Sequence, residues 1–261
     1  MGFLFAQQTD IGIKKSINQD SLYVAEANTP AGAVLLAVVC DGMGGLSKGE
    51  LASAEVCRAF SRWFKEELPN LLSSSNQSAP INIAGIESSL ANLLKNCNDA
   101  ILDYSVRHHL TVGTTALALL LTTTSYYIVN IGDSRVYQID TALYQLTKDQ
   151  SVVQQEVDLG ILSQEQAEMD SRRNILLQCM GAKPTIEPQF IYGTYLPDTV
   201  FLLCTDGFRH VITPKELYES LCPQKMLSEA QMHDNLKALV ELNKSRNETD
   251  NITAIAIRQV P

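Results

Sequence analysis

The sequence predicts an α+β fold with a mostly antiparallel sheet core, on three observations. Short apolar or alternating runs bounded by Gly, Asp, Asn or Pro recur along the chain, which is typical of strands. Two amphipathic helical patterns stand together in the first half, and two more lie near the end. The order of strands, helix pair, strands, helices and final strand is not a regular β-α-β alternation, so a parallel sheet is not favoured.

Six apolar runs are predicted as strands: Ala33–Cys40, Thr115–Thr122, Tyr126–Ile131, Arg135–Ile139, Thr199–Cys204 and Asn251–Arg258. The runs Tyr126–Ile131 and Arg135–Ile139 flank the turn-like tripeptide Gly132-Asp133-Ser134, so we predict that they form a hairpin. The alternating run Leu22–Ala25 follows Asp20 and predicts a further strand.

The first helical pattern extends from Ala52 to Phe64, and Ser47 with Glu50 forms a candidate capping box at its start. The second stripe runs from Leu90 to Tyr104. The Ser/Asn/Pro-rich stretch Leu71–Pro80 lies between them and predicts a surface loop. Two helices joined in this way are expected to pack as an antiparallel pair.

The second half of the chain contains three more helical stretches. The polar segment 151–174 is predicted to be helical, with Ser163 and Gln166 as a capping pair. Two helices are predicted near the C-terminus, over Pro214–Leu221 and Leu227–Lys244.

The composition is that of a globular protein with an acidic balance. Of the 261 residues, 45% are hydrophobic and 19% are charged, and the net charge is −9. A negative charge of this size argues against binding nucleic acid or an anionic membrane, because polyanions require a basic surface. No apolar run reaches the ~20 residues that span a bilayer. The six Cys lack C-x-x-C spacing and no signal peptide is recognised, so a cytoplasmic location is expected.

Five Asp residues lie directly beside predicted strands. Asp41, Asp133 and Asp206 follow a strand, whereas Asp20 and Asp250 precede one. Any single Asp-Gly pair is more often an ordinary turn than a site. However, the strands of one sheet can bring their ends together, and five carboxylates at one edge repel each other unless cations neutralise them.

Divalent metal ions are the counter-charge that this arrangement favours. No cluster of Lys or Arg lies near these Asp residues in the sequence. Ligation by oxygen alone selects Mg²⁺ or Mn²⁺ over Zn²⁺, which prefers His or Cys. An Asp that bridges two such ions ~4 Å apart would generate a metal-bound hydroxide for in-line attack on phosphorus. The residues therefore predict a two-metal phosphoesterase site.

At this point the chain resembles a known family, the metal-dependent protein phosphatases of the PPM class, also called type 2C serine/threonine phosphatases, in their compact bacterial form. Seven motifs match in the family's order and span residues 18 to 251: Asn18-Gln19-Asp20, Asp41-Gly42-Met43-Gly44-Gly45, Gly113-Thr114-Thr115, Gly132-Asp133-Ser134-Arg135, Thr147-Lys148-Asp149-Gln150-Ser151, Thr205-Asp206-Gly207 and Asp250-Asn251.

The resemblance implies a four-layer αββα sandwich, in which two packed antiparallel sheets are flanked by helix pairs. Residues 1–261 would form a single catalytic domain, with a mobile flap at about 151–190. Asp41 would bridge the two metal ions and the Gly42 carbonyl would help to hold one of them. The remaining implied ligands, partly acting through water, are Asp20, Asp206 and Asp250, with Asp133 at a third, weaker ion.

The implied function is a serine/threonine protein phosphatase that uses Mn²⁺ or Mg²⁺. Asp41, Asp20, Asp206 and Asp250 would carry catalysis, in which a water or hydroxide bridging the ions attacks phosphoserine or phosphothreonine. Its partners would be phosphorylated proteins, and it would oppose a serine/threonine kinase in the cytoplasm. No Cys stands in a phosphate-cradling arrangement, so a tyrosine-phosphatase mechanism is not favoured.

The chain departs from the family pattern on its substrate side. The Arg that grips the substrate phosphate is replaced by Lys15, which keeps the charge but loses the bidentate fork. In the flap, Asp170-Ser171 replaces His-Pro, which brings flap contacts with substrate into question. Position 43 is Met, so a His acid is absent there. Among the four His residues, His210 is the candidate that could reach the site.

Two other functions compete with an active phosphatase. The first is a catalytically weak pseudophosphatase that acts as a binding or sensing module on the same fold, which the replacement at Lys15 keeps open. The second is a two-metal nuclease or a hydrolase of small phosphoesters, which the net charge of −9 disfavours.

Overall fold

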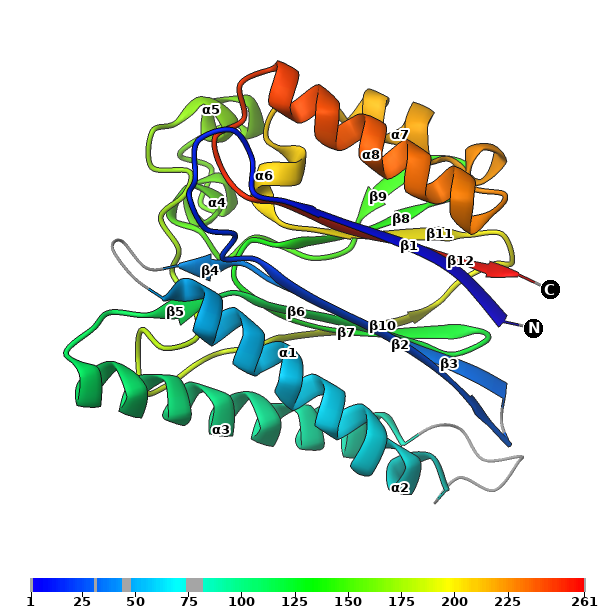
Figure 1. Ribbon diagram of the computed structural model, residues 1–261, viewed down its shortest axis with the longest axis horizontal. Coiled ribbons are helices and arrows are strands. Elements are labelled where there is room, and N and C mark those ends of the chain that lie inside the picture. Colours follow the sequence, from blue (N-terminus) through cyan, green and yellow to red (C-terminus); the bar gives the residue numbers. More distant parts are fainter. Residues whose placement is uncertain (1, 31, 44–47, 74–81, 261) are drawn as a thin grey trace.

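Two antiparallel five-stranded sheets pack face to face, and helices cover the outer face of each (Figure 1). The computed structural model describes residues 2–30, 32–43, 48–73 and 82–260. The α+β class and the four-layer αββα sandwich that the sequence predicts are therefore confirmed. In the part of the chain that the structure describes, no helix is long and apolar enough to cross a membrane.

Each sheet combines strands from distant parts of the sequence. The first sheet has the order β1 (Gly2–Asp10), β12 (Ile252–Val260), β11 (Val200–Cys204), β8 (Arg135–Ile139), β9 (Leu143–Gln145). The second has the order β10 (Gln189–Thr194), β7 (Ser125–Ile131), β6 (Ala116–Leu121), β3 (Gly32–Cys40), β2 (Ser21–Thr29). A two-stranded ribbon of β4 (Gly42–Met43) and β5 (Gly113–Thr114) extends one end. The strands β1, β9 and β10 are not among those predicted.

Strand β3 shows why the sheets pack on both faces. Its side chains alternate across the strand, so that Leu36 and Val38 face the helices while Leu35 and Val39 face the other sheet. All four are almost completely buried. At ~25 cal/mol per Å² of apolar surface, this two-sided burial stabilises the strand strongly and fixes its register.

The helices form the two outer layers. Trp63 of α1 is buried and its Nε1 donates a hydrogen bond of 2.8 Å to Ser89 Oγ of α3, which ties the predicted antiparallel pair together. The second sheet is covered by α1 (Gly49–Glu66), α2 (Leu68–Ser73) and α3 (Ile83–His108). The first sheet is covered by α6 (Asp206–Arg209), α7 (Pro214–Leu221), the 3₁₀ turn η1 (Pro223–Lys225) and α8 (Glu229–Ser245).

The predicted hairpin between residues 126–131 and 135–139 is wrong. Strand β7 belongs to the second sheet and pairs with β6 and β10, whereas β8 belongs to the first sheet and pairs with β11 and β9. The tripeptide from Gly132 to Ser134 therefore carries the chain from one sheet to the other. Gly132 has a φ of 111°, which a residue with a side chain rarely adopts.

Two local predictions around the first helix need adjustment. Ser47 of the predicted capping box lies outside the described residues, and the residue before the helix is Lys48, which makes no side-chain cap. The predicted loop Leu71–Pro80 begins too early, because residues 71–73 still belong to α2 and the rest lie outside the described residues.

The polar segment after Ser151 forms two short helices rather than one. These are α4 (Val152–Asp158) and α5 (Gln164–Met169), and the predicted capping box of Ser163 and Gln166 is present at the start of α5. Gly160 lies in the turn between them with a φ of 70°. Figure 1 shows both helices at the end of the sandwich where β4 and β5 lie.

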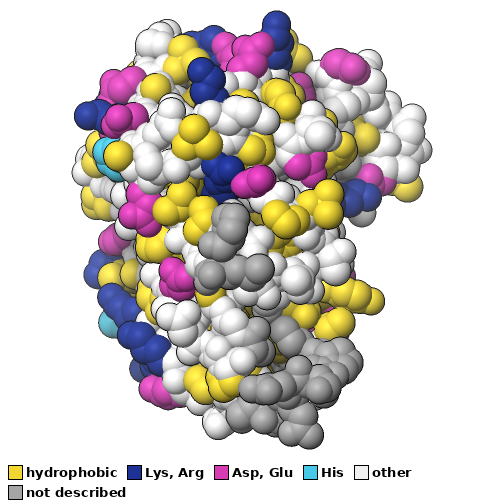
Figure 2. Space-filling view, turned by 90° about the vertical axis from the view of Figure 1, so that its right-hand side faces the viewer, with side chains coloured by type: hydrophobic (Ala, Val, Ile, Leu, Met, Phe, Trp, Pro, Cys, Tyr) yellow, Lys and Arg dark blue, Asp and Glu magenta, His cyan; other side chains and the backbone are white. Residues whose placement is uncertain are grey.

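The opposite end of the molecule carries both chain termini (Figure 1). Figure 2 shows this face, on which Lys and Arg side chains are interspersed with Asp, Glu and hydrophobic residues.

We expect Gly132→Ala to lower the free energy of unfolding by about 3 kcal/mol, because of the positive φ and a clash. An added Cβ would lie 2.6 Å from Cγ2 of Thr115. Gly160→Ala is the matched control, since its φ is also positive but nothing lies within 4 Å of the added atom. It should cost only about 1 kcal/mol. Urea denaturation measures both, and equal losses would contradict the steric argument.

Candidate active site

The five predicted carboxylates lie at one end of the sandwich. Within the second sheet, Ser21 pairs with Cys40, so Asp20 and Asp41 stand side by side where β2 begins and β3 ends. Within the first sheet, β11 ends and β12 begins at the same edge, which places Asp206 near Asp250. Asp133 enters from the crossing between the sheets.

Hydrogen bonds between the two sheets hold these strand ends together. Thr205 Oγ1 donates to Asp20 Oδ2 at 3.0 Å. Asn251 Oδ1 accepts from the Gln19 backbone N–H at 2.9 Å, and its Nδ2 donates to carbonyls of the loop between β1 and β2. The Asn of the Asp250-Asn251 motif therefore positions the loop that carries the first Asp, a role that the sequence did not reveal.

The backbone of Asp41 is fixed by the motif at residues 113–115. Its N–H donates to Thr115 Oγ1 at 2.8 Å, and its carbonyl accepts from the Thr115 N–H at 2.8 Å and from Thr114 Oγ1 at 2.9 Å. Thr115 Oγ1 in turn lies 3.0 Å from Ser134 Oγ. Thr114, Thr115 and Ser134 thus fix the position of the central carboxylate through hydrogen bonds.

Gly42 follows Asp41 where three backbone segments meet. Its N–H donates to the Gln19 carbonyl at 3.2 Å. A Cβ at Gly42 would lie 2.4 Å from the carbonyl oxygens of both Gln19 and Gly49. Only glycine fits there, because these contacts are with rigid backbone atoms.

Burial and mutual repulsion both shift the pKa values of the carboxylates upward, and burial is the larger cause. Burial, together with the charges of Asp206 and Asp250, raises the pKa of Asp20 to about 7. Burial raises the pKa of Asp41 well above its ordinary value, and the charges of the other four carboxylates add to this. The Oδ1 atoms of Asp20 and Asp206 are buried without a hydrogen-bond partner.

These features fit a site for hard divalent cations. The donors are carboxylate and carbonyl oxygens, and two of the oxygens lack a partner. Among the described residues, no three Asp, Glu, His or Cys side chains are arranged to hold one ion by themselves. The ions would therefore take several ligands from water and from the backbone, as Mg²⁺ ordinarily does.

Lys15 lies beside the carboxylates. Its Nζ is 2.8 Å from Asp250 Oδ1, and 40% of the Lys15 side chain is exposed. Burial by itself would lower the pKa of Lys15, but the hydrogen bond to Asp250 and the charges of Asp41 and Asp206 raise it overall. The ammonium group therefore stays charged at the exposed side of the site.

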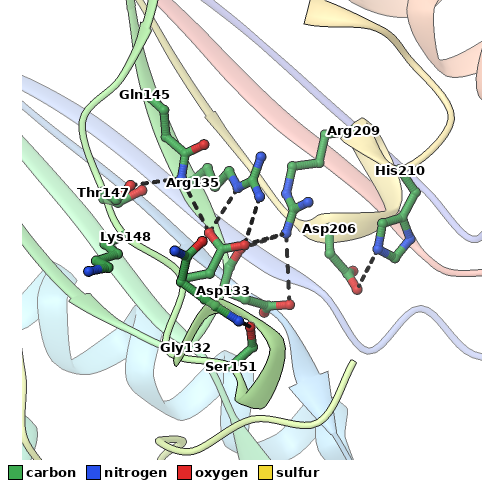
Figure 3. A network of polar contacts seen from close by, with 12 residues as sticks. Gly132, Asp133, Arg135, Gln145, Thr147, Lys148, Ser151, Asp206, Arg209 and His210 are labelled. Carbon is green, nitrogen blue, oxygen red and sulfur yellow. Dashed lines mark hydrogen bonds and ion pairs between the residues drawn. The ribbon is translucent and has the colours of Figure 1, made fainter. Parts of the chain in front are cut away.

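A second network of charges lies next to Asp133 (Figure 3). Arg135 donates from Nε and Nη2 to the two carboxylate oxygens of Asp149, both at 2.8 Å. Arg209 approaches the same carboxylate, with Nη2 3.3 Å from Asp149 Oδ2. Burial would raise the pKa of Asp149, but the charge of Arg209 and the hydrogen bonds of Arg135 lower it. Sequence analysis assigned no role to Arg209 or Asp149.

His210 reaches the site as anticipated. Its Nε2 lies 3.6 Å from Asp206 Oδ2, and its Nδ1 lies 3.5 Å from Glu248 Oε2 (Figure 3 shows the first contact). The imidazole thus lies between two buried carboxylates. Glu248 was not recognised in the sequence, because nothing near it in the chain marks it.

The protein phosphatase 2C family model matches residues 12–241. The chain belongs to the protein phosphatase 2C family. The predicted membership of the PPM class is therefore confirmed. The serine/threonine phosphatase Stp of Listeria monocytogenes is 29% identical over 259 residues, which cover 97% of this chain and 94% of that protein.

Solved structures of the same kind agree. The serine/threonine phosphatase Stp1 of Staphylococcus aureus superimposes with a TM-score of 0.82 at 27% identity, covering 98% of this chain and 95% of that one. The catalytic domain of the serine/threonine protein phosphatase PstP, in complex with two manganese ions, gives a TM-score of 0.77 at 26% identity, with 99% of both chains covered.

We expect the metal-free protein to lose stability as the pH rises from about 4 to about 7. The pKa of Asp20 is raised from 3.8 to about 7, so in this range the unfolded chain has released protons that the folded chain still binds. Thermal unfolding in EDTA should give a lower Tm at about pH 8 than at about pH 5, and Mn²⁺ should restore it.

Asp20→Asn is the control for this effect, because the amide cannot titrate. The variant should flatten the pH dependence in EDTA and should be more stable than the wild type at about pH 8. A wild-type Tm in EDTA that is equal or higher at about pH 8 than at about pH 5 would contradict the raised pKa of Asp20 in the folded protein.

Proposed function

We propose that this chain hydrolyses phosphoserine and phosphothreonine in proteins with the aid of two Mn²⁺ or Mg²⁺ ions. The observation that carries the proposal is the convergence of five carboxylates from both sheets, two of which have a buried oxygen without a partner. Family membership and the named activity of the relatives support the same reaction.

The chain would hold the ions with Asp41, Asp20, Asp206 and Asp250, together with the Gly42 carbonyl. Asp41 is suited to the position between the ions, because the charges of the other four carboxylates all act on it. When bound, such ions lower the pKa of water and neutralise the charge of a phosphate. The inter-sheet bonds of Thr205 and Asn251 would keep the ligands in place during the reaction.

Lys15 is suited to bind the substrate phosphate, which is a dianion at neutral pH. It lies on the exposed loop between β1 and β2 and contacts Asp250, so a short movement of its flexible side chain would bring its charge to a bound phosphate. As a point charge it would orient the phosphate less than an Arg fork.

The segment 151–190 is proposed to act as a flap beside the site. In this segment Arg172 is already engaged, because Nη1 and Nη2 donate to both Glu156 oxygens at 2.8 and 2.7 Å, and Nη2 also pairs with Asp170. Arg172 is therefore not free to contact substrate.

The cytoplasmic location, the phosphoprotein substrates and the opposing serine/threonine kinase stay predictions.

The pseudophosphatase alternative gains no support. All five carboxylates are present at the strand ends, and the relatives are named as phosphatases. The nuclease alternative likewise has no observation in its favour.

Phosphate release from a phosphothreonine peptide and from p-nitrophenyl phosphate tests the proposal directly. We expect turnover with Mn²⁺ or Mg²⁺, none in EDTA, and a loss of more than about 100-fold in Asp206→Asn. Asp99→Asn, an exposed carboxylate on α3 that pairs with Lys95, is the control and should match the wild type. A folded protein that binds Mn²⁺ yet releases no phosphate from either substrate would refute the proposal.

The role of Lys15 is tested by comparing neighbouring lysines. Lys15→Ala should lower kcat/KM for the phosphopeptide by about 10-fold or more, since a charge-assisted contact is lost. Lys15→Arg should raise it by about 3-fold or more, because the fork orients the phosphate. Lys14→Ala removes an exposed charge of the same loop and should have little effect. If both alanine variants lowered kcat/KM equally, Lys15 would act only through the general charge of the loop and not through a specific contact with the phosphate.

A further inference from the structure

Arg209 lies within the acidic end of the molecule. It is the last residue of the short helix α6, and only 12% of its side chain is exposed. Its Nη2 donates to the Asp133 carbonyl at 3.1 Å and lies 3.9 Å from Asp133 Oδ2. Figure 3 shows the guanidinium reaching from α6 toward Asp133, with a dashed line marking the contact.

Two arginine side chains lie against the carboxylates of this corner, and Arg209 Nη2 is 3.3 Å from Asp149 Oδ2 and 3.9 Å from Asp133 Oδ2. Arg135 is committed to Asp149 through a bidentate pair. Arg209 provides a second positive charge, which lies beside the negative carboxylate of Asp133. Two acidic and two basic side chains thus stand together, whereas Asp20 and Asp206 each retain a buried oxygen with no partner. Asp133 therefore has a nearly buried arginine beside it, whereas Asp250 pairs with the exposed Lys15.

The Arg209 side chain is held in place more firmly than the Lys15 side chain. The Lys15 side chain is 40% exposed on a loop, whereas that of Arg209 is 12% exposed and keeps its charge at every accessible pH. Helix α6 is fixed from behind, since Asn243 Nδ2 donates to the Phe208 carbonyl at 2.9 Å and Phe208 is fully buried. Moving the guanidinium away would leave Asp133 as an uncompensated buried charge, which is costly.

We propose that the Arg209 guanidinium takes the place at Asp133 that the family resemblance assigns to a third metal ion. The chain then holds two metal ions, and the Arg209 guanidinium supplies the positive charge that a third ion would supply. The inference rests on the proposed two-ion function, but it concerns the number of ions rather than the reaction. The ion count and the phosphatase assay therefore fail independently of each other.

Mn²⁺ binding by equilibrium dialysis, with free Mn²⁺ read by electron paramagnetic resonance, tests the ion count. The wild type should bind two ions per chain and no third at millimolar Mn²⁺. Arg209→Gln removes the charge and should gain a third site that binds at least about 10-fold more tightly than any third site in the wild type. Adding Asp133→Asn to that variant should abolish the gain, and Arg209→Lys, which keeps the charge, should stay at two.

Several outcomes would overturn the inference. A third ion in the wild type that disappears in Asp133→Asn would show that Arg209 does not exclude it. A folded Arg209→Gln variant that still binds only two ions would show that the charge of Arg209 is not what excludes a third ion. Should Arg209→Gln fail to fold, Asp133→Asn in the wild-type background decides, since losing one of the bound ions contradicts the proposal. A wild type that binds no Mn²⁺ would instead refute the two-ion function.

Discussion

Burial and mutual repulsion of the carboxylates together form the constraint on which the rest of this structure depends. Both sheets end at the same edge, and the sequence places an Asp at each of the strand ends that meet there. Burial and proximity raise the pKa values of Asp20 and Asp41, so the fold works against its own acidic site. It can do so because strands such as β3 are buried on both faces, and because Thr205 and Asn251 bond one sheet to the other directly at the site.

Two kinds of cation relieve this repulsion, and the structure separates them in space. Toward Asp133 the protein provides its own, because Arg135 and Arg209 are nearly buried and pair with Asp149 and Asp133. Toward Asp20 and Asp206 no arginine or lysine of comparable burial lies among the described residues, and one oxygen of each carboxylate has no hydrogen-bond partner. Lys15 is an intermediate case, since its charge is present but exposed. Under the proposed two-ion function, this division assigns the metal ions to the half with Asp20 and Asp206 and the arginine to the half with Asp133.

The sequence predicted the parts of the molecule whose pattern is local. Continuous apolar runs identified β3, β6 and β11, and the Asp that follows the runs of β3 and β11 identified two of the candidate ligands. The edge strands β1 and β10 were missed, because their half-exposed residues give no strong alternation. The hairpin at Gly132 was wrong because a turn tripeptide looks the same whether it joins two strands of one sheet or crosses between sheets. Arg209 and Glu248 were missed because their partners lie 76 and 38 residues away in the sequence, at Asp133 and His210.

The departures from the family pattern lie where the fold tolerates them. Lys15 and Asp170 both lie on exposed connections, outside the three buried clusters, and neither contributes to the bonds that hold Asp41. Changes at such positions alter the contacts available to a phosphoprotein at little cost to the arrangement of the carboxylates. Arg172 illustrates this, since its pairs with Glu156 and Asp170 hold the flap segment together from within. The proposed ion-binding half is thus fixed by strands and inter-sheet hydrogen bonds, while the proposed substrate-binding half is set by loops that can vary independently of it.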